Sequence, residues 1–290
     1  MNQLLAGGAA ILALCCAMPA HAQAQVQDPG PLLEETVFDG DYLAIGIGAA
    51  ISPSYTGSDD YVFSPLPIVQ GSYKGIDINP RGAGLAVDFI ADPQGGGVGF
   101  DLGVVARLRS DRASSIEDEV VESLGELDRA VEVGPTAGIS LTRVLNPYDS
   151  LTFSGDVTWD VAGAHEGMVI TPSVSYFTPL SRAMAASLSL GAEYGDEKFH
   201  DYYFRVTPAQ SVATGGALPV FDPGEGGFTR AGATLLLALD LNGNLADGGW
   251  GLVAVGGYSR VLGDAKDSPF TSLRGSADQF LGALGIGYTF

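Results

Sequence analysis

Hydrophobic and polar residues alternate with a period of two over several segments of the chain, each about ten residues long. In residues 97–108 the alternate positions from Val98 to Leu108 are all apolar, while Asp101 and Arg107 fall on the opposite face. A helix would scatter these two charges around its circumference, whereas a strand places them on one side. The alternation therefore predicts β-strands with one apolar face and one face of small or polar residues.

The C-terminal segment, residues 280–290, has the same alternation and ends on an aromatic residue. One face of this strand carries Phe280, Leu284, Ile286, Tyr288 and Phe290, and the other carries mostly small residues. This pattern is typical of the closing strand of a bacterial outer-membrane barrel, which shows apolar side chains to lipid. We expect Ile286, Tyr288 and Phe290 to form the assembly signal, with the barrel-assembly machinery as a partner.

Short turns rich in glycine, proline and asparagine alternate with long polar connections. The short turns lie at 73–75, 92–96, 146–149 and 178–181, and the long connections at 52–62, 110–129, 195–227 and 263–278. In such barrels short turns face the periplasm and long loops the exterior. Pro80-Arg81-Gly82 divides residues 76–90 into two short strands. The sequence thus predicts an all-β fold, a single antiparallel transmembrane β-barrel of twelve strands, with ten as the alternative.

The cost of charge in lipid decides which face of each strand points inward. A basic side chain at the bilayer midplane costs about 2–4 kcal/mol, so the charged face lines the lumen. The candidate lumen-facing charges are Asp101, Arg107, Glu132, Asp156, Asp160 and Glu193. They form either a polar constriction or a neutralised, hydrogen-bonded plug. The plug is favoured, because a twelve-stranded barrel encloses less than a porin does, and the loop at 195–227 is long enough to fold inward.

The N-terminus predicts export. Residues 4–18 are too short to span a bilayer and precede the small-residue cleavage site Pro19-Ala20-His21-Ala22. We expect a signal peptide over 1–22, cleaved after Ala22, then a periplasmic lead-in over 23–40 and the barrel over 41–290. A lipoprotein signal at Cys15 or Cys16 is the alternative, but the bulky Leu14 disfavours it. Cleavage leaves no cysteine, which excludes disulfides and thiolate chemistry from the mature protein.

Composition agrees with this localisation. The chain has 14 basic and 34 acidic residues, a net charge of −20, which disfavours nucleic acid as a partner. Hydrophobic residues nevertheless make up 46% of the chain. Apolar residues that face lipid explain the high hydrophobic content, and acidic residues in the loops and lumen explain the negative charge. We therefore expect the protein to lie in the outer membrane of a Gram-negative bacterium, in contact with lipid and lipopolysaccharide. An interfacial aromatic girdle explains Trp159, Tyr176, Tyr194, Trp250, Tyr258 and Tyr288 near the strand ends.

Motifs that carry catalysis or metal binding are absent from the sequence. It has neither a Gly-x-Ser-x-Gly elbow nor a His-Glu-x-x-His motif. We expect the histidines of the mature chain, His165 and His200, to be solvated loop residues. Ca²⁺ binding by Asp59, Asp60 and the acidic run 117–128 is an alternative to a solvated acidic surface, although EF-hand spacing is lacking. The sequence therefore predicts no catalytic residue, no cofactor, no metal site and no enzymatic activity.

Three ordered stretches carry a resemblance to a known family. Residues 52–61 followed by Pro65-Leu66-Pro67 resemble the first-loop signature of the MipA/OmpV family (MltA-interacting protein), and residues 207–222 and 258–280 resemble its large-loop motif and last hairpin. The matching residues are Tyr55, Gly57, Ser58, Asp59, Asp60 and Tyr61; Pro208 and Gln210; and Gly263, Asp264, Ser268, Pro269, Arg274, Gly275, Asp278, Gln279 and Phe280.

This resemblance implies a non-enzymatic outer-membrane barrel. The family's best-known role is a scaffold that links a lytic transglycosylase, which is a periplasmic murein hydrolase, to a murein synthase during peptidoglycan remodelling. Two other hypotheses stay open: a narrow pore or entry route for small solutes, and a surface adhesin.

Overall fold

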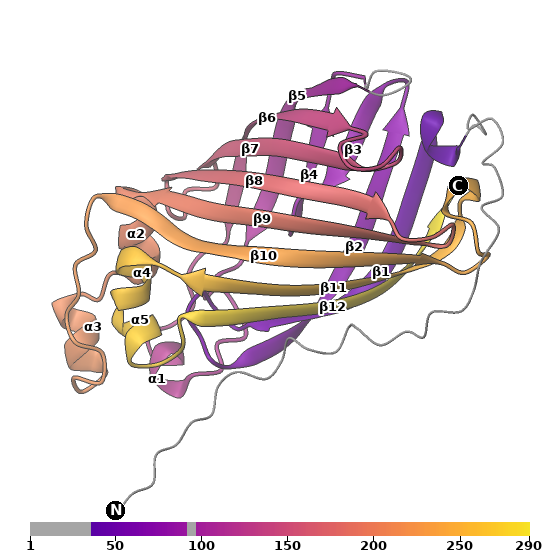
Figure 1. Ribbon diagram of the computed structural model, residues 1–290. Coiled ribbons are helices and arrows are strands. Elements are labelled where there is room, and N and C mark those ends of the chain that lie inside the picture. The colour runs from indigo at the N-terminus through magenta and orange to yellow at the C-terminus, as the bar shows by residue number, and fades with distance from the viewer. Residues whose placement is uncertain (1–35, 92–96) are drawn as a thin grey trace, which may run out of the picture. The chain divides into compact units, whose positions relative to one another are not determined.

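The computed structural model describes residues 36–91 and 97–290, so the expected signal peptide and most of the lead-in lie outside the described residues. The described part of the chain forms one closed antiparallel barrel of twelve strands, in which each strand pairs with its neighbours in sequence and β12 pairs with β1 (Figure 1). The predicted fold class and strand count are confirmed. No helix in this part of the chain is long and apolar enough to cross a membrane.

The strands are β1 (Tyr42–Pro53), β2 (Tyr61–Tyr73), β3 (Ile76–Pro80), β4 (Gly84–Asp88), β5 (Val98–Arg109), β6 (Ala130–Thr142), β7 (Ser150–Asp160), β8 (Met168–Pro179), β9 (Met184–Asp196), β10 (Gly226–Asp240), β11 (Gly249–Val261) and β12 (Asp278–Thr289). The short helices are η1 (Val37–Asp39), α1 (Glu119–Glu122), α2 (Glu197–Phe204), α3 (Pro208–Ala213), η2 (Leu245–Asp247), α4 (Gly263–Asp267) and α5 (Pro269–Ser272). The interruption at Pro80 separates β3 from β4, as the sequence predicted.

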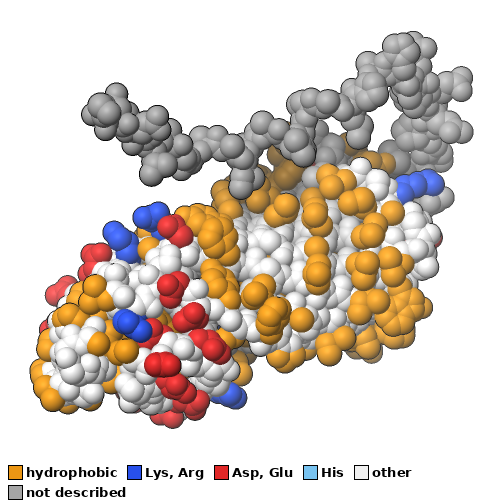
Figure 2. Space-filling model, turned by 90° about the horizontal axis from the view of Figure 1, so that it is seen from below, with side chains coloured by type: hydrophobic (Ala, Val, Ile, Leu, Met, Phe, Trp, Pro, Cys, Tyr) orange, Lys and Arg blue, Asp and Glu red, His pale blue; other side chains and the backbone are white. Residues whose placement is uncertain are grey.

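The alternation of apolar and polar positions sets the two faces of the wall. On β5, Phe100 and Leu102 are exposed on the outside, whereas Gly103 and Val105 are buried on the inside. Hydrophobic side chains are spread over the barrel wall in Figure 2, while acidic side chains gather at the end that carries the helices. The outer apolar band is the surface that faces lipid in a transmembrane barrel.

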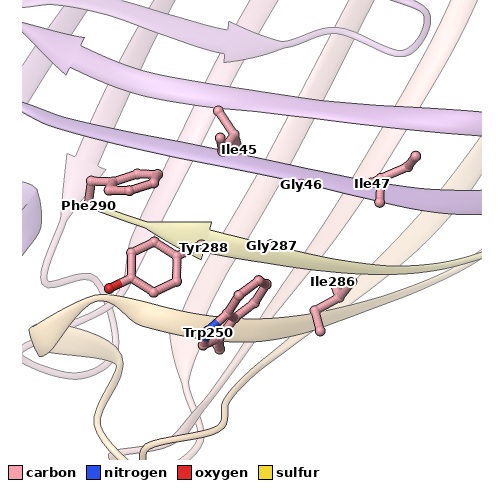
Figure 3. Close-up of a pocket in the computed structure, with 8 residues that line it drawn as sticks. All are labelled: Ile45, Gly46, Ile47, Trp250, Ile286, Gly287, Tyr288 and Phe290. Atoms are coloured by element: carbon pink, nitrogen blue, oxygen red, sulfur yellow. The ribbon is translucent and has the colours of Figure 1, made fainter.

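The first and last strands close the barrel at a seam of glycines. Gly46 and Gly48 of β1 lie opposite Gly287 and Gly285 of β12, which lets the two backbones approach closely on the inner side. Outward from the seam the structure places the closing-strand residues Ile286, Tyr288 and Phe290, beside Ile45 and Ile47 of β1 and Trp250 of β11 (Figure 3).

The long connections pack together at one end of the barrel, where Figure 1 shows helices α1 to α5. We call residues 54–60, 110–129, 197–225 and 262–277 the loop cap. Its first buried cluster draws a side chain from every one of these loops, and consists of Tyr55, Ile116, Val121, Val206, Leu218 and Phe270. A second cluster joins α2 and α4 to the ends of β8 and β11, and consists of Val169, Phe199, Tyr203, Phe204, Val261 and Ala265. The long loops are therefore a folded layer with its own apolar core.

Candidate functional site

A network of charged side chains crosses the barrel interior directly beneath the loop cap. Glu132 of β6 is fully buried and accepts hydrogen bonds from Nε of Arg107 and Nε of Arg109, both on β5. Glu193 of β9 accepts from Nη2 of Arg109 at 2.9 Å and from Nη2 of Arg230, on β10, at 3.1 Å. Because β5 and β9 are not neighbours in the sheet, the bridge from Arg109 to Glu193 spans the lumen.

The loop cap seals this network from above. The guanidinium of Arg109 lies over the ring of Phe199 in α2, with 4.8 Å between Cζ and the ring centroid. Arg107 completes its hydrogen bonding below, donating from Nη2 to the hydroxyls of Thr158 at 3.0 Å and Thr171 at 3.2 Å. Buried charges are tolerated only when they are paired and hydrogen-bonded, and these charges are.

His165 belongs to the same network through its hydrogen-bonding pattern. The N–H of Gly167 donates to Nδ1 of His165 at 3.1 Å, so Nδ1 carries no proton. The proton of the neutral ring therefore sits on Nε2, which lies 3.3 Å from Oε1 of Glu132 and donates to it. The expectation that His165 is solvated is wrong, because only 2% of this residue is exposed.

The same expectation is wrong for His200, which is 1% exposed within α2. Asp196 caps this helix by accepting from the N–H of Phe199 at 3.0 Å. The helix then buries one stripe, made of residues 199, 200, 203 and 204, against the ends of the strands. This helical spacing of Phe-His-x-x-Tyr-Phe was the signal in the sequence that could have revealed the burial of His200.

The burial of His200 predicts that the loop cap is sensitive to acid. Burial lowers the pKa of His200, against the opposing effects of its hydrogen bond to the Gly227 carbonyl and of nearby Asp264 and Asp196. Its Nδ1 is buried without a hydrogen-bond partner, so a proton there would be an unsatisfied buried charge. In the unfolded cap the pKa of His200 is about 6.5, so below this pH the unfolded cap binds a proton at His200 whereas the folded cap does not.

We therefore expect the free energy of local unfolding of the cap to be constant at higher pH and to fall as the pH drops below about 6.5. Hydrogen–deuterium exchange of α2 amides, corrected for intrinsic rates, should show faster exchange at acidic pH. The His200→Gln variant should lose this dependence. An unchanged acid response in that variant would assign the effect to another group.

The structure brings together only some of the predicted lumen charges. Arg107, Glu132 and Glu193 meet in the network. Asp156 lies apart, 3.9 Å from Nε of Arg81, and Asp160 accepts from the backbone N–H groups of its own loop. Asp101 lies 3.5 Å from the Ser140 hydroxyl on the neighbouring strand.

Sequence reasoning missed Arg109, Arg230 and His165 as members of the network. Arg109 was predictable, because it lies two residues beyond Arg107 and so on the same face of β5. Arg230 follows an irregularity in the β9–β10 register between Phe228 and Arg230, which the alternation alone does not reveal.

Two of the family motifs meet within the loop cap. The N–H of Gly57 donates to Oε1 of Gln279 at 3.2 Å, and Nε2 of Gln279 donates to the Ser58 carbonyl at 2.9 Å. Ser58 also forms a β-bridge with Gly275, where a Cβ would clash with the Gly57 carbonyl. The first loop and the last hairpin therefore form one unit, although Gly57 and Gln279 are 222 residues apart in the sequence.

The remaining motif residues occupy several parts of the outer end. Tyr55, Ser268 and Pro269 are buried in the loop cap, where Arg274 also forms an ion pair with Asp118. Helix α4 begins with Gly263 and Asp264, and the first turn of α3 contains Pro208 and Gln210. Asp59 and Asp60 are exposed, and the outer ends of β2 and β12 carry Tyr61, Asp278 and Phe280. Asp118, from the acidic run, caps α1 and is largely buried. Among residues 36–91 and 97–290, no three His, Cys, Asp or Glu side chains gather as metal ligands.

A small apolar patch stands at the opposite, periplasmic end. Leu145 and Tyr148 on the β6–β7 turn and Leu180 on the β8–β9 turn are exposed, Leu145 by 79%, and we call these three residues the rim patch. Asn146 joins the β6–β7 turn to the end of β8 by donating from Nδ2 to the Thr178 hydroxyl at 3.0 Å.

Asp149 fixes the shape of the β6–β7 turn. Its carboxylate accepts from the N–H groups of Val144 at 2.7 Å and Leu145 at 2.9 Å, and from the Tyr176 hydroxyl at 2.6 Å. Desolvation opposes ionisation of Asp149, but the hydrogen bonds outweigh it and hold its pKa below the usual range. The turn therefore presents Leu145 on a frame that is stable at neutral pH.

A closed barrel with an apolar outer band, short turns at one end and folded loops at the other defines an outer-membrane barrel protein. The family model described as "MltA-interacting protein MipA" matches residues 45–290, and the chain belongs to this family. The resemblance found in the sequence is thereby confirmed.

Comparison with solved structures found similar chains, which include the following three. An outer membrane channel from Pseudomonas putida F1 is 14% identical, with a TM-score of 0.44 over 87% of this chain and 96% of that chain. The toluene transporter TodX of Pseudomonas putida is 8% identical, with a TM-score of 0.37 over 87% and 89% of the chains. OprD of Pseudomonas aeruginosa is 11% identical, with a TM-score of 0.28 over 88% and 98%. No curated protein sequence matches the chain.

Proposed function

We propose that this protein is an outer-membrane scaffold without catalysis of its own, which holds a lytic transglycosylase and a murein synthase at the periplasmic rim. The observation that carries the proposal is the match of residues 45–290 to a family described by its interaction with MltA. The periplasm is where both enzymes meet peptidoglycan, so the scaffold contact belongs to the short-turn end of the barrel.

The interior of the barrel supports a structural role over conduction. A wide aqueous path requires hydrated charges along the lumen, whereas Glu132 and Glu193 are buried and shared between arginines. The stacking of Phe199 on Arg109 extends this closure into the loop cap. A barrel closed at its outer end is suited to presenting a fixed surface on its inner end.

The rim patch is the contact surface that we propose. Exposed apolar groups on a rigid turn gain about 1.5–3 kcal/mol each when a partner buries them fully. Full-length protein refolded in detergent and immobilised should retain a purified lytic transglycosylase and a murein synthase. The double variant Leu145→Glu, Leu180→Glu should weaken retention by tenfold or more, since tenfold corresponds to only about 1.4 kcal/mol.

Leu241→Glu is the matched control, because Leu241 is an exposed leucine on the β10–β11 turn outside the rim patch. It should leave retention unchanged. Failure of the unaltered barrel to retain either enzyme would refute the scaffold proposal, and retention that is equal in the double variant would move the contact away from the rim patch.

A further inference from the structure

Most of β2 lacks a neighbour on one side. It pairs with β1 along its whole length, from Tyr42↔Ser72 to Pro53↔Tyr61, but with β3 only through residues 71–73. Among the residues that the structure describes, residues 61–70 pair with no strand on the side away from β1. At about 3.3 Å per residue this open edge is roughly 30 Å long.

Two prolines stand on this open edge with their nitrogens facing it. The N–H of Phe290 donates to the Leu43 carbonyl, so odd-numbered residues of β1 bond to β12 and even-numbered residues bond to β2. Through the β1–β2 register, the odd-numbered residues of β2 then point their N–H and C=O groups at the open edge. Pro65 and Pro67 are odd-numbered and remove two N–H groups that would otherwise be unpaired there.

The prolines make the edge a poor template for another strand. A strand added to β2 would find no donor at Pro65 or Pro67, which is how edge strands avoid pairing with other chains. Elsewhere in the barrel Pro135 and Pro172 also coincide with interruptions of pairing, to β7 and β9 respectively. In β2 the interruption of pairing extends over most of the strand, and Pro65 and Pro67 disfavour pairing with any added strand.

The open edge is one side of a stretch of the barrel wall without strand pairing, and we call this stretch the window. The turn at 81–83 between β3 and β4 lies below it, and β5 lies on the far side, where the N–H of Leu108 donates to the Ala83 carbonyl at 3.1 Å. Above it the N–H of Thr56 donates to Oδ1 of Asp111 at 3.1 Å, which joins the first loop to the loop after β5.

The window lies at the height of the lipid-facing band. Pro67 pairs with Ile47 and Phe63 pairs with Ile51, and both isoleucines are exposed on the outer surface of β1. Backbone groups at this depth are tolerated where they line a water-containing cavity, so the carbonyls of the open edge require water from the lumen.

Apolar side chains of β2 line the lumen beside the window, together with Ser64 and with Arg81 of the turn below, whose Nε lies 3.9 Å from Oδ2 of Asp156 on β7. Leu66 and Ile68 of β2 face inward, and Ile68 lies over the glycine face of β12 at Gly285. Leu281 of β12 also faces inward and is 37% exposed, so this sector has accessible space. The opposite wall carries hydroxyl pairs such as Ser154 and Ser173, 2.8 Å apart.

We propose that the window admits the acyl chain of a membrane amphiphile into the apolar sector of the lumen, with its polar head at the hydrated edge. The charge network closes the outer end of the lumen, so the route from the membrane is sideways through the wall. This inference goes beyond the scaffold proposal, and neither depends on the other.

Fluorescence quenching by lipid bromine tests the proposal in the full-length barrel. Both native tryptophans, Trp159 and Trp250, are first replaced by phenylalanine, and a single tryptophan is then placed at Leu66. The folded barrel is reconstituted in phosphatidylcholine brominated along its acyl chains. We expect Leu66→Trp to lose as large a fraction of its emission as the lipid-facing control Ile47→Trp.

Ser187→Trp is the matched interior control, because Ser187 faces inward on β9, which is paired on both sides at this position. Its quenching should be much weaker. Quenching of Leu66→Trp no greater than that of Ser187→Trp would overturn the proposal. This holds also if the weak quenching arises because a second copy of the chain or residues 1–35 cover the open edge. If Leu66→Trp does not fold, a nitroxide on Ser64→Cys replaces it. Collision with lipid-soluble oxygen no greater than for the same label at Ser187 would overturn the proposal equally.

Discussion

Replacing Glu132 by alanine is expected to lower the free energy of unfolding by about 3–5 kcal/mol, the usual cost of leaving a buried charge without its partner. The carboxylate of Glu132 is shared by Arg107 and Arg109 and receives a hydrogen bond from His165. Without it, Arg107 retains only threonine hydroxyls, while Arg109 keeps Glu193. Urea unfolding of the barrel in lipid vesicles, followed by tryptophan fluorescence, measures the change.

Two further variants separate lost charge pairing from lost volume. Removing both members of a pair is often nearly neutral, so Glu132→Leu with Arg107→Met should recover much of the stability that Glu132→Ala loses. Lys198→Ala breaks the exposed pair with Glu166, at 3.8 Å, and should cause no measurable change. Equal unfolding midpoints for Glu132→Ala and Lys198→Ala would show that the network does not stabilise the barrel.

The wall of the barrel was predictable because its physical causes are local. Asp101 and Arg107 are both at odd-numbered positions of one strand, so they share a face that cannot contact lipid. The same alternation assigns the two faces of every other strand. Pro80 and Gly82 likewise mark the break between β3 and β4 from sequence alone. The strand count then follows from the requirement that short turns and long loops alternate between two ends.

The site could be predicted only in part, because its contacts join distant parts of the chain. The alternation of side chains along each strand places Arg107, Glu132 and Glu193 inside the barrel. The pairing of Arg109 with Glu193, 84 residues later in the sequence, depends on the relative register of the five strands β5 to β9. The burial of His200 depends on how α2 packs on the strand ends. Pro65 and Pro67 were readable as a family motif, whereas the open edge that they face emerged only from the pairing of β2.

Replacing Gly48 by valine is expected to disrupt closure of the barrel. A Cβ at Gly48 would clash with the carbonyl oxygen of Leu284 and would lie 2.9 Å from Cα of Gly285, both backbone atoms held in the β1–β12 ladder. Overpacking commonly costs about 1–3 kcal/mol, and a clash with fixed backbone belongs at or above the top of that range. The fraction of refolded protein that resists unfolding in electrophoresis without heating should fall sharply.

Gly256→Val controls for the general effect of valine on a glycine in a strand. Gly256 lies on β11 opposite Gly282, and an added Cβ there meets no atom within 4 Å. Its outer face contacts lipid, where an apolar side chain is favourable, and valine also suits a strand. This variant should therefore fold as well as the unaltered protein. If Gly48→Val and Gly256→Val refold equally well, close backbone approach at the β1–β12 seam is not what closes the barrel.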